Sequence, residues 1–277
     1  MSNFNILKVS EKHIKKDVLL IENNDLFYHV FDEKDLPSDI TNITLKSQKD
    51  VDFVIVLRTK SPLIVYNIAP YTRGKIIFVC ENEDVKTSRE IHLQEGAEID
   101  LIVPDFSAGN RALNIETKLL GKGAKANWHL SSYSQNNDKK VFKISFSHFA
   151  DKSFADMHNY GVVLDQSTLI FTGDSTIYEA VKGAETHQTA RIIVFDEGST
   201  AQADPILNIY HNDVIAASHA ATVGRVNAEH LYYLNSRGLT ELEAKQLITK
   251  GYLLPIINYI DDEELKEKFI AQLEGVI

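Results

Sequence analysis

Histidine is the residue whose setting in this chain most clearly suggests chemistry. The chain has 10 histidines, and His219 stands in a run of small residues, after Ala217 and Ser218 and before Ala220 and Ala221. Small side chains in a strand let another backbone or a ligand approach closely, and an imidazole that projects there could coordinate a metal. The alternative is a packed strand-to-helix turn with an incidental histidine.

The other metal-ligating residues give weaker patterns. His187 and His211 lie in neighbouring repeats of the sequence, but no pair of histidines has the i, i+4 spacing of a helical zinc motif. Cys80 is the only cysteine, so neither an intramolecular disulfide nor a multi-cysteine metal cage can form. We interpret His187 and His211 as polar residues on exposed strands.

Motifs for nucleotide binding and for serine hydrolysis are missing. Gly121, Lys122 and Gly123 lack the GxxxxGK[ST] frame of a phosphate loop, and no GxSxG elbow occurs. Acidic pairs such as Asp196 and Glu197 stand in turn-like sequence, where we expect them to be solvated. The chain is therefore expected not to bind ATP by itself.

Bulk composition narrows the possible partners. The chain has 277 residues, 44% hydrophobic, and a formal net charge of −10 from 39 acids and 29 bases. This balance argues against general nucleic-acid binding, which needs a basic face to neutralise phosphates. The N-terminus has no apolar signal-peptide core, and no run approaches the length of a membrane span. We expect a cytoplasmic protein with no membrane or nucleic-acid partner.

Between residues 40 and 226 the sequence consists of short apolar runs separated by Gly, Asn, Asp and Ser. Several of these runs alternate apolar and polar residues, the period of a half-buried strand. Dense strands without intervening helices exclude the doubly wound α/β class and leave a sandwich, a barrel or a β-solenoid.

An internal repeat favours the solenoid. Small turn residues followed by an alternating strand begin at Gly96, Gly123, Ser153, Ser175 and Gly198, spaced 22 to 30 residues apart. A loose period of this length is typical of stacked coils, which cannot bury their apolar side alone. The repeats of a sandwich would have no reason to resemble one another.

The pattern changes to helical after Gly224. Asn227 is a plausible N-cap, and the apolar stripe that follows ends at Gly238, a C-terminal glycine stop. Thr240 and Glu243 form a capping box that opens a second helix, which Pro255 should kink or end. We therefore divide the chain into a short N-terminal segment (1–40), a β-helix core (41–225) and a C-terminal helical domain (226–277).

Residues 218–239, SHAATVGRVNAEHLYYLNSRGL, resemble the C-terminal signature of the SufB/SufD family, scaffold components of the SUF iron–sulfur cluster assembly machinery. The SufD form is close to CSHGATVG followed by QLFYLxSRG[IL]. Residues 185–191 resemble the family's YQxxR segment, and Asp196 with residues 203–209 its DxxAxxxPxLEI strand. The resemblance is clear over residues 167–251 and fainter back to residue 62.

The resemblance implies a right-handed parallel β-helix with a C-terminal α-helical domain. It also implies a SufB-like partner chain, a SufC-like ABC-type ATPase and a non-enzymatic scaffold role. His219 occupies the histidine position of SufD, with Ser218 and Ala220 beside it at the partner interface. His219 is thus the candidate metal ligand for a transient iron–sulfur cluster at that interface, with no cofactor bound stably. The candidate ATPase-docking residues are Leu231, Tyr232, Tyr233, Leu234 and Arg237.

Departures from the family pattern limit what can be carried over. The reactive SufB cysteine falls near Thr189, which cannot act as a thiolate, and the cysteine before the SufD histidine is Ala217 here. A self-pairing scaffold that holds a cluster through a homodimer is an alternative, and it would need a thiolate such as Cys80. A β-helix carbohydrate-active enzyme would need clustered acids on one solenoid face, a pattern that the sequence does not reveal.

Overall fold

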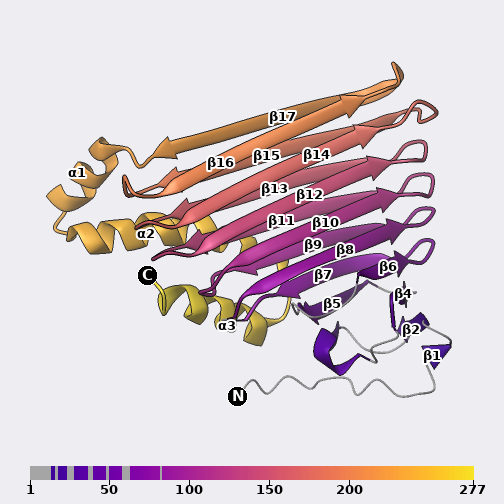
Figure 1. The fold of residues 1–277 in the computed structure, drawn as a ribbon, viewed down its shortest axis with the longest axis horizontal. Coiled ribbons are helices and arrows are strands. Elements are labelled where there is room, and N and C mark those ends of the chain that lie inside the picture. The colour runs from indigo at the N-terminus through magenta and orange to yellow at the C-terminus, as the bar shows by residue number, and fades with distance from the viewer. Residues whose placement is uncertain are drawn as a thin grey trace.

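Alternation of inward apolar and outward polar residues builds two stacked sheets. The structure is a computed structural model that describes residues 14–15, 18–23, 28–36, 40–47, 50–57, 63–81 and 83–277. In β14 (Thr168–Ile177) every second residue is buried and the residues between are half exposed. This is the period-two pattern of a strand with one face on a core. It recurs coil after coil, and the chain winds as a solenoid (Figure 1).

The strands alternate between the two sheets along the chain. We call one sheet the even sheet because it holds the even-numbered strands, together with β1. Its members are β1 (Ile14–Lys15), β2 (Val18–Asn23), β4 (Asn42–Ser47), β6 (Ile64–Ile68), β8 (Val85–Leu93), β10 (Arg111–Leu119), β12 (Lys139–His148), β14 and β16 (Thr200–Ile209). The odd sheet contains β3 (Tyr28–Asp32), β5 (Val51–Val56), β7 (Arg73–Val79), β9 (Glu98–Asp105), β11 (Lys125–Ser134), β13 (Phe154–Val163), β15 (Ala184–Val194) and β17 (Val214–Arg225).

Neighbouring strands within each sheet pair in parallel, except β1 with β2. Each coil therefore contributes one strand to each sheet and hydrogen-bonds to the coils before and after it. The predicted parallel β-helix with C-terminal helices is confirmed. The strands β2 and β3, from the N-terminal segment, pair with β4 and β5. Parts of residues 1–40 lie outside the described residues, and the domain boundaries at 40 and 225 remain a prediction.

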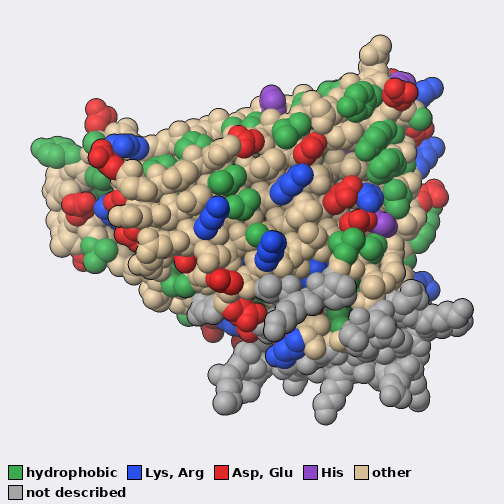
Figure 2. All heavy atoms as spheres, in the orientation of Figure 1, with side chains coloured by type: hydrophobic (Ala, Val, Ile, Leu, Met, Phe, Trp, Pro, Cys, Tyr) green, Lys and Arg blue, Asp and Glu red, His purple; other side chains and the backbone are tan. Residues whose placement is uncertain are grey.

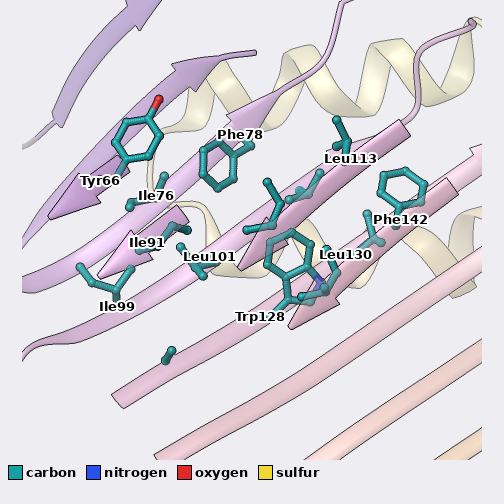
Figure 3. Packing of buried hydrophobic residues seen from close by; sticks show 14 of the residues in the cluster. Tyr66, Ile76, Phe78, Ile91, Ile99, Leu101, Leu113, Trp128, Leu130 and Phe142 are labelled. Carbon is teal, nitrogen blue, oxygen red and sulfur yellow. The ribbon is translucent and has the colours of Figure 1, made fainter. Parts of the chain in front are cut away.

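The lumen between the sheets is filled by large apolar side chains. Figure 3 shows labelled members of this core pointing inward from successive strands: Tyr66, Ile76, Phe78, Ile91, Ile99, Leu101, Leu113, Trp128, Leu130 and Phe142. Trp128 is fully buried, and its indole N–H donates to Asn159 Oδ1 at 2.9 Å. Burying each such side chain contributes about 1.5–3 kcal/mol, so the stack of coils stabilises itself mainly through this lumen.

Fully buried charges cross-link one corner of the lumen. Asp105 accepts hydrogen bonds from Arg111 Nε (3.0 Å), Lys140 Nζ (2.8 Å) and Ser132 Oγ (2.9 Å). Burial opposes ionisation of Asp105, but the two cations hold its pKa below the ordinary value. Lys140 also donates to the carbonyls of Ser107 and Tyr133. The charges are paired and hydrogen-bonded, as buried charges must be.

Three α-helices follow the last strand: α1 (Ala228–Ser236), α2 (Glu241–Leu253) and α3 (Glu263–Glu274). The predicted caps are confirmed, since Asn227 accepts from the N–H of Glu229 and Thr240 forms the capping box with Glu243. α1 ends before Gly238, whose φ of +96° suits glycine. Pro255 stands at the start of a 3-10 helix, η3 (Leu254–Tyr259), which follows α2 directly. Another 3-10 helix, η2, spans Glu33–Asp35 near the N-terminus.

The helical layer covers the outer face of the odd sheet. Ile256, Phe269 and Leu273 pack in one apolar cluster with Ile77 and Ile102, which face outward from β7 and β9. Figure 1 shows α1 projecting beyond the ends of the strands while α2 and α3 lie along them. In agreement, α1 contains no buried residue.

Candidate functional site

The last coil, formed by β16 and β17, is the open end of the solenoid. β16 and β17 are edge strands of the even and odd sheets. Neither contains a buried residue, whereas the strands that they pair with, β14 and β15, bury alternate positions. An edge strand presents a row of unpaired N–H and C=O groups, and a terminal repeat without a polar cap leaves apolar side chains uncovered.

Large apolar side chains are exposed on and next to the last coil. Ile206 and Ile209 are each 41% exposed, Tyr210 59%, Ile215 69% and Val223 43%. β17 contains no acidic or basic residue before Arg225 apart from one histidine. Figure 2 shows few charged side chains along the upper edge of the molecule, over β17. A long, uncharged edge of this kind marks an interaction site.

The register of β17 separates the three predicted interface residues. His219 pairs with Gln188 of β15, which is 3% exposed and faces the lumen, so His219 belongs to the inner face of the last coil. Ser218 and Ala220 pair with His187 and Thr189 and belong to the outer face. The predicted trio is therefore divided between two faces, with the imidazole over the open lumen.

Beneath His219, the buried side chain of Gln188 has a hydrogen-bond partner at one of its two polar atoms only. Gln188 Nε2 donates to the carbonyl of Ile206 at 2.9 Å, while Gln188 Oε1 has no hydrogen-bond partner. The described residues contain no group of three or more His, Cys, Asp or Glu side chains arranged to hold a metal ion. Coordination of a metal by His219 therefore remains a prediction, and further ligands would have to come from outside the described part of this chain.

The predicted docking residues on α1 differ in exposure. Tyr232 is 77% exposed and Tyr233 54%, whereas Leu231 and Leu234 are half buried. The Arg237 guanidinium lies 5.1 Å from the centre of the Tyr233 ring, a cation–π contact that fixes the exposed face of that ring. The tyrosines are thus available to a partner, and the leucines face the protein.

α2 continues this surface. Its residues Leu242 and Leu247 are 63% and 51% exposed. Lys245 lies 3.5 Å from Asp196 and 5.8 Å from the centre of the Phe195 ring, which attaches α2 to the solenoid next to the last coil. We call α1 and α2 together the docking helices; their exposed surface contains Tyr232 and Tyr233 of α1 and Leu242 and Leu247 of α2.

Two groups of polar residues were not predicted from the sequence. The first is an acidic pocket on the odd sheet, lined among others by Asp52, Lys75, Asp100 and Asp261. Burial, together with nearby carboxylates and against the opposing charge of Lys75, raises the pKa of Asp52 to about 6. Lys75 pairs with Asp261 at 2.6 Å, so this group attaches the helical layer to the sheet. No sequence signal connects residues so far apart in the chain.

The second group is formed by Glu185, His187 and Ser218. His187 lies 2.7 Å from Ser218 through Nδ1 and 2.9 Å from Glu185 through Nε2. The i, i+2 spacing of Glu185 and His187 places both on one face of β15, which the sequence could have indicated. The neighbour Ser218 follows only from the register between coils.

Cys80 lies in the lumen, 1% exposed. Burial, with Asp105 nearby, raises the pKa of its thiol to about 12 despite the opposing Arg111 and Lys140. Since the thiolate is the reactive form, we expect Cys80 in the native chain to react with iodoacetamide at pH 8 at least about 100-fold more slowly than in urea. Mass spectrometry of the alkylated chain checks this, and labelling at equal rates in both states would contradict the burial of Cys80.

Two buried histidines predict an acid-sensitive fold. Burial lowers the pKa of His148 to about 4 and, with His158, that of His129 to about 4. Between pH 6.5 and 4 the unfolded chain binds a proton at each site that the folded chain does not, so stability falls as the pH falls. We expect a loss of about 3 kcal/mol at His148 over this range.

Urea unfolding at pH 7, 6, 5 and 4.5 measures this loss. Replacement His148→Leu removes the titrating group at a position whose neighbours in register are Leu119 and Ile177. The variant should show a flatter dependence of unfolding free energy on pH, and an unchanged slope would refute the assignment to His148.

In the described part of the chain, no helix has the length and apolar character needed to cross a membrane.

The sequence of this chain matches one family of known proteins. The family profile described as "SUF system FeS cluster assembly, SufBD core domain" matches residues 81–252. The iron–sulfur cluster assembly protein SufD of Bacillus subtilis is 28% identical over 264 residues, which cover 93% of this chain and 59% of that protein.

Shorter matches agree. An iron–sulfur cluster assembly SufBD family protein of Mycobacterium leprae is 33% identical over 38% of this chain and 27% of its own length. SufD of Escherichia coli is 29% identical over 40% of this chain and 26% of its own length. The chain thus spans little more than half the length of the curated relative that it matches most extensively here.

Proposed function

The chain belongs to the SufB/SufD family of the SUF iron–sulfur cluster assembly system, with a SufD-like sequence, and from this premise we propose that it is a scaffold subunit of a cluster assembly complex. Its partners are a SufB-like chain and a SufC-like ABC-type ATPase. The single observation that carries the proposal is the last coil, an apolar and almost uncharged edge that leaves the solenoid open.

Pairing takes place along β17. A partner strand added to this edge would satisfy the free N–H and C=O groups, and the partner's coils would cover the exposed apolar residues. His219, on the inner face, would then lie within the interface, where ligands from the partner chain can complete a site for a transient iron–sulfur cluster. The cluster is the cargo of assembly, and no cofactor is bound stably.

The docking helices receive the ATPase. Exposed aromatic residues are typical anchors of protein interfaces, and Tyr232 and Tyr233 lie next to the last coil on a helix with no role in the core. ATP-driven association of two ATPase subunits would pull on the docking helices of both scaffold chains and strain the pair. Catalysis in this scheme belongs to the ATPase, and the chain itself acts as a scaffold in the cytoplasm.

The self-pairing scaffold is a weaker proposal. It needs a thiolate to hold the cluster, and Cys80 is buried in the lumen with a raised pKa. The proposal that the chain is a carbohydrate-active enzyme is weaker still. Two carboxylates of the acidic pocket are engaged in structural contacts, Asp261 with Lys75 and Asp100 with Asn127 at 2.7 Å.

Replacement Tyr233→Asp tests the docking of the ATPase. The change puts a charge at the centre of the proposed contact and removes an aromatic anchor, so we expect affinity for a SufC-like ATPase to fall at least about 30-fold. Co-purification of the tagged chain with the ATPase measures this.

Tyr71→Asp is the matched control. Tyr71 is 67% exposed and belongs to a turn before β7, at the other end of the solenoid from the last coil. This variant should retain the ATPase, and circular dichroism should show that both variants keep their β-sheet content. Retention of the ATPase by Tyr233→Asp would refute docking through α1.

A further inference from the structure

We propose that Ser218 is an activated nucleophile that accepts acyl groups from small esters. This activity is separate from the scaffold role and adds a reaction to a chain for which the sequence predicts no catalysis. It rests on a hydrogen-bonded series on the outer face of the odd sheet, in which Ser218 contacts His187 and His187 contacts Glu185.

The fold positions all three side chains. His187 and Ser218 are direct partners in the parallel ladder of β15 and β17, so their side chains leave the sheet on the same face about 4.8 Å apart. Glu185 precedes His187 by two residues and shares that face. A β-bulge in β17 sets this register. Its extra residue, Ile215, lies opposite the step from Ala184 to Glu185, and the shift brings Ser218 beside the histidine.

The contacts define the proton positions. A carboxylate only accepts hydrogen bonds, so the 2.9 Å contact with Glu185 places the imidazole proton on Nε2. The lone pair on Nδ1 then accepts the hydroxyl proton of Ser218 at 2.7 Å. This is the order of nucleophile, base and orienting acid found in serine hydrolases, with the two ring nitrogens exchanged. Ser218 and His187 act on the substrate, and Glu185 positions His187.

The edge of the sheet supplies a donor for the developing oxyanion. Consecutive N–H groups of a strand point alternately to its two sides, and β17 has a neighbour on one side only. Of the amides of Ser218 and His219, one therefore faces the free edge of β17. Backbone N–H groups at the nucleophile or the residue after it are common oxyanion donors.

The surroundings fit a small substrate. Ser218 is exposed, and the side chains of His187 and Glu185 are each 31% exposed. The Phe154 ring lies 6.3 Å from the His187 ring and offers an apolar wall for a short acyl chain. Because Ser218 lies on the exposed last strand, we expect low selectivity.

The reaction proceeds in two balanced steps. Ser218 Oγ attacks the ester carbonyl carbon while its proton moves to His187 Nδ1. The carbon–oxygen bond to the alcohol breaks, the alcohol takes that proton, and an acyl-serine remains. Water then attacks the acyl-serine, again giving its proton to His187, and the acid leaves as Ser218 Oγ recovers the proton.

The chain contains internal controls. His158 pairs with Asp156 at 3.0 Å and His92 with Glu90 at 2.8 Å, the same histidine–acid arrangement on one strand. Neither histidine has a serine as its direct neighbour in the register. The contact with a serine therefore distinguishes the His187–Glu185 pair from the other two histidine–acid pairs.

The test is acetylation of the isolated full chain by p-nitrophenyl acetate at pH 7.5, with peptide mass spectrometry to locate the acetyl group. We expect the adduct on Ser218, with none on Ser236, an exposed serine bonded only to the Tyr233 carbonyl. Ser218→Ala should abolish the adduct. His187→Gln should slow acetylation about 100-fold, the usual contribution of a general base.

Two further variants separate chemistry from structure. His158→Gln should leave acetylation of Ser218 unchanged. Glu185→Gln should slow it, and the ¹⁵N chemical shifts of the His187 ring should change from an Nε2–H tautomer to a mixture of both tautomers. Absence of an adduct on Ser218, or an equal rate in His187→Gln, would overturn the proposal. Because the assay uses the chain alone, either result leaves the pairing proposal untouched.

Discussion

Replacement Asp105→Ala is expected to lower the free energy of unfolding by about 3–5 kcal/mol, the largest stability effect that we predict for a single substitution. Asp105 is the only carboxylate that contacts Arg111 and Lys140 among the described salt bridges, and all three side chains are 0% exposed. Without it, both buried cations lose their directly contacting carboxylate, and only the more distant charge of Asp138 still acts on them. Urea denaturation followed by circular dichroism measures the change.

Glu179→Ala is the matched control, since Glu179 is an exposed acid in the turn after β14. It should shift the free energy by less than about 0.5 kcal/mol. A combined apolar replacement of Asp105, Arg111 and Lys140 should not restore stability, because the two cations also bind backbone carbonyls, among them those of Glu81 and Tyr133. An Asp105→Ala variant as stable as the control would show that these charges are not structural.

Replacement Val223→Lys is expected to weaken binding to a SufB-like chain at least about 30-fold. Val223 is 43% exposed on β17 and pairs with Ile192, a lumen residue, so it lies on the inner face of the open end. Burying an unpaired ammonium there costs about 2 kcal/mol or more. Co-purification of the tagged variant with a SufB-like chain measures the loss.

Leu120→Lys is the matched control for this prediction. Leu120 is 38% exposed, but it lies in the turn after β10, away from the last coil. The control variant should bind like the wild type. Equal binding of both variants would exclude the inner face of the last coil from the interface.

The sequence predicts the solenoid and its helices because both depend on local signals. Repeated turn residues reveal stacked coils, and Asn227, Thr240 and Gly238 terminate helices through bonds to nearby residues. Lys140 also carries a signal that was missed. The alternation of its strand puts it in phase with Phe142 and Ile144, on the inner face.

The candidate site could be predicted only in part, because its geometry depends on register between coils. The run of small residues points to β17, but coil lengths vary and a bulge shifts the pairing after Ala184. Alternation along the strand puts Ser218 and His219 on opposite faces, but sequence spacing alone could not show which of the two faces inward. The acidic pocket joins Asp52 to Asp261, residues related only by the docking of the helices on the odd sheet.

Hydrogen–deuterium exchange of the chain with and without a SufB-like partner tests most directly that the last coil is the pairing surface. We expect amide exchange in β17 (Val214–Arg225) to slow at least about tenfold on mixing, because its free edge gains hydrogen bonds. Exchange in β9 (Glu98–Asp105), paired on both sides, should not change. Protection elsewhere with β17 unaffected would contradict the proposed pairing.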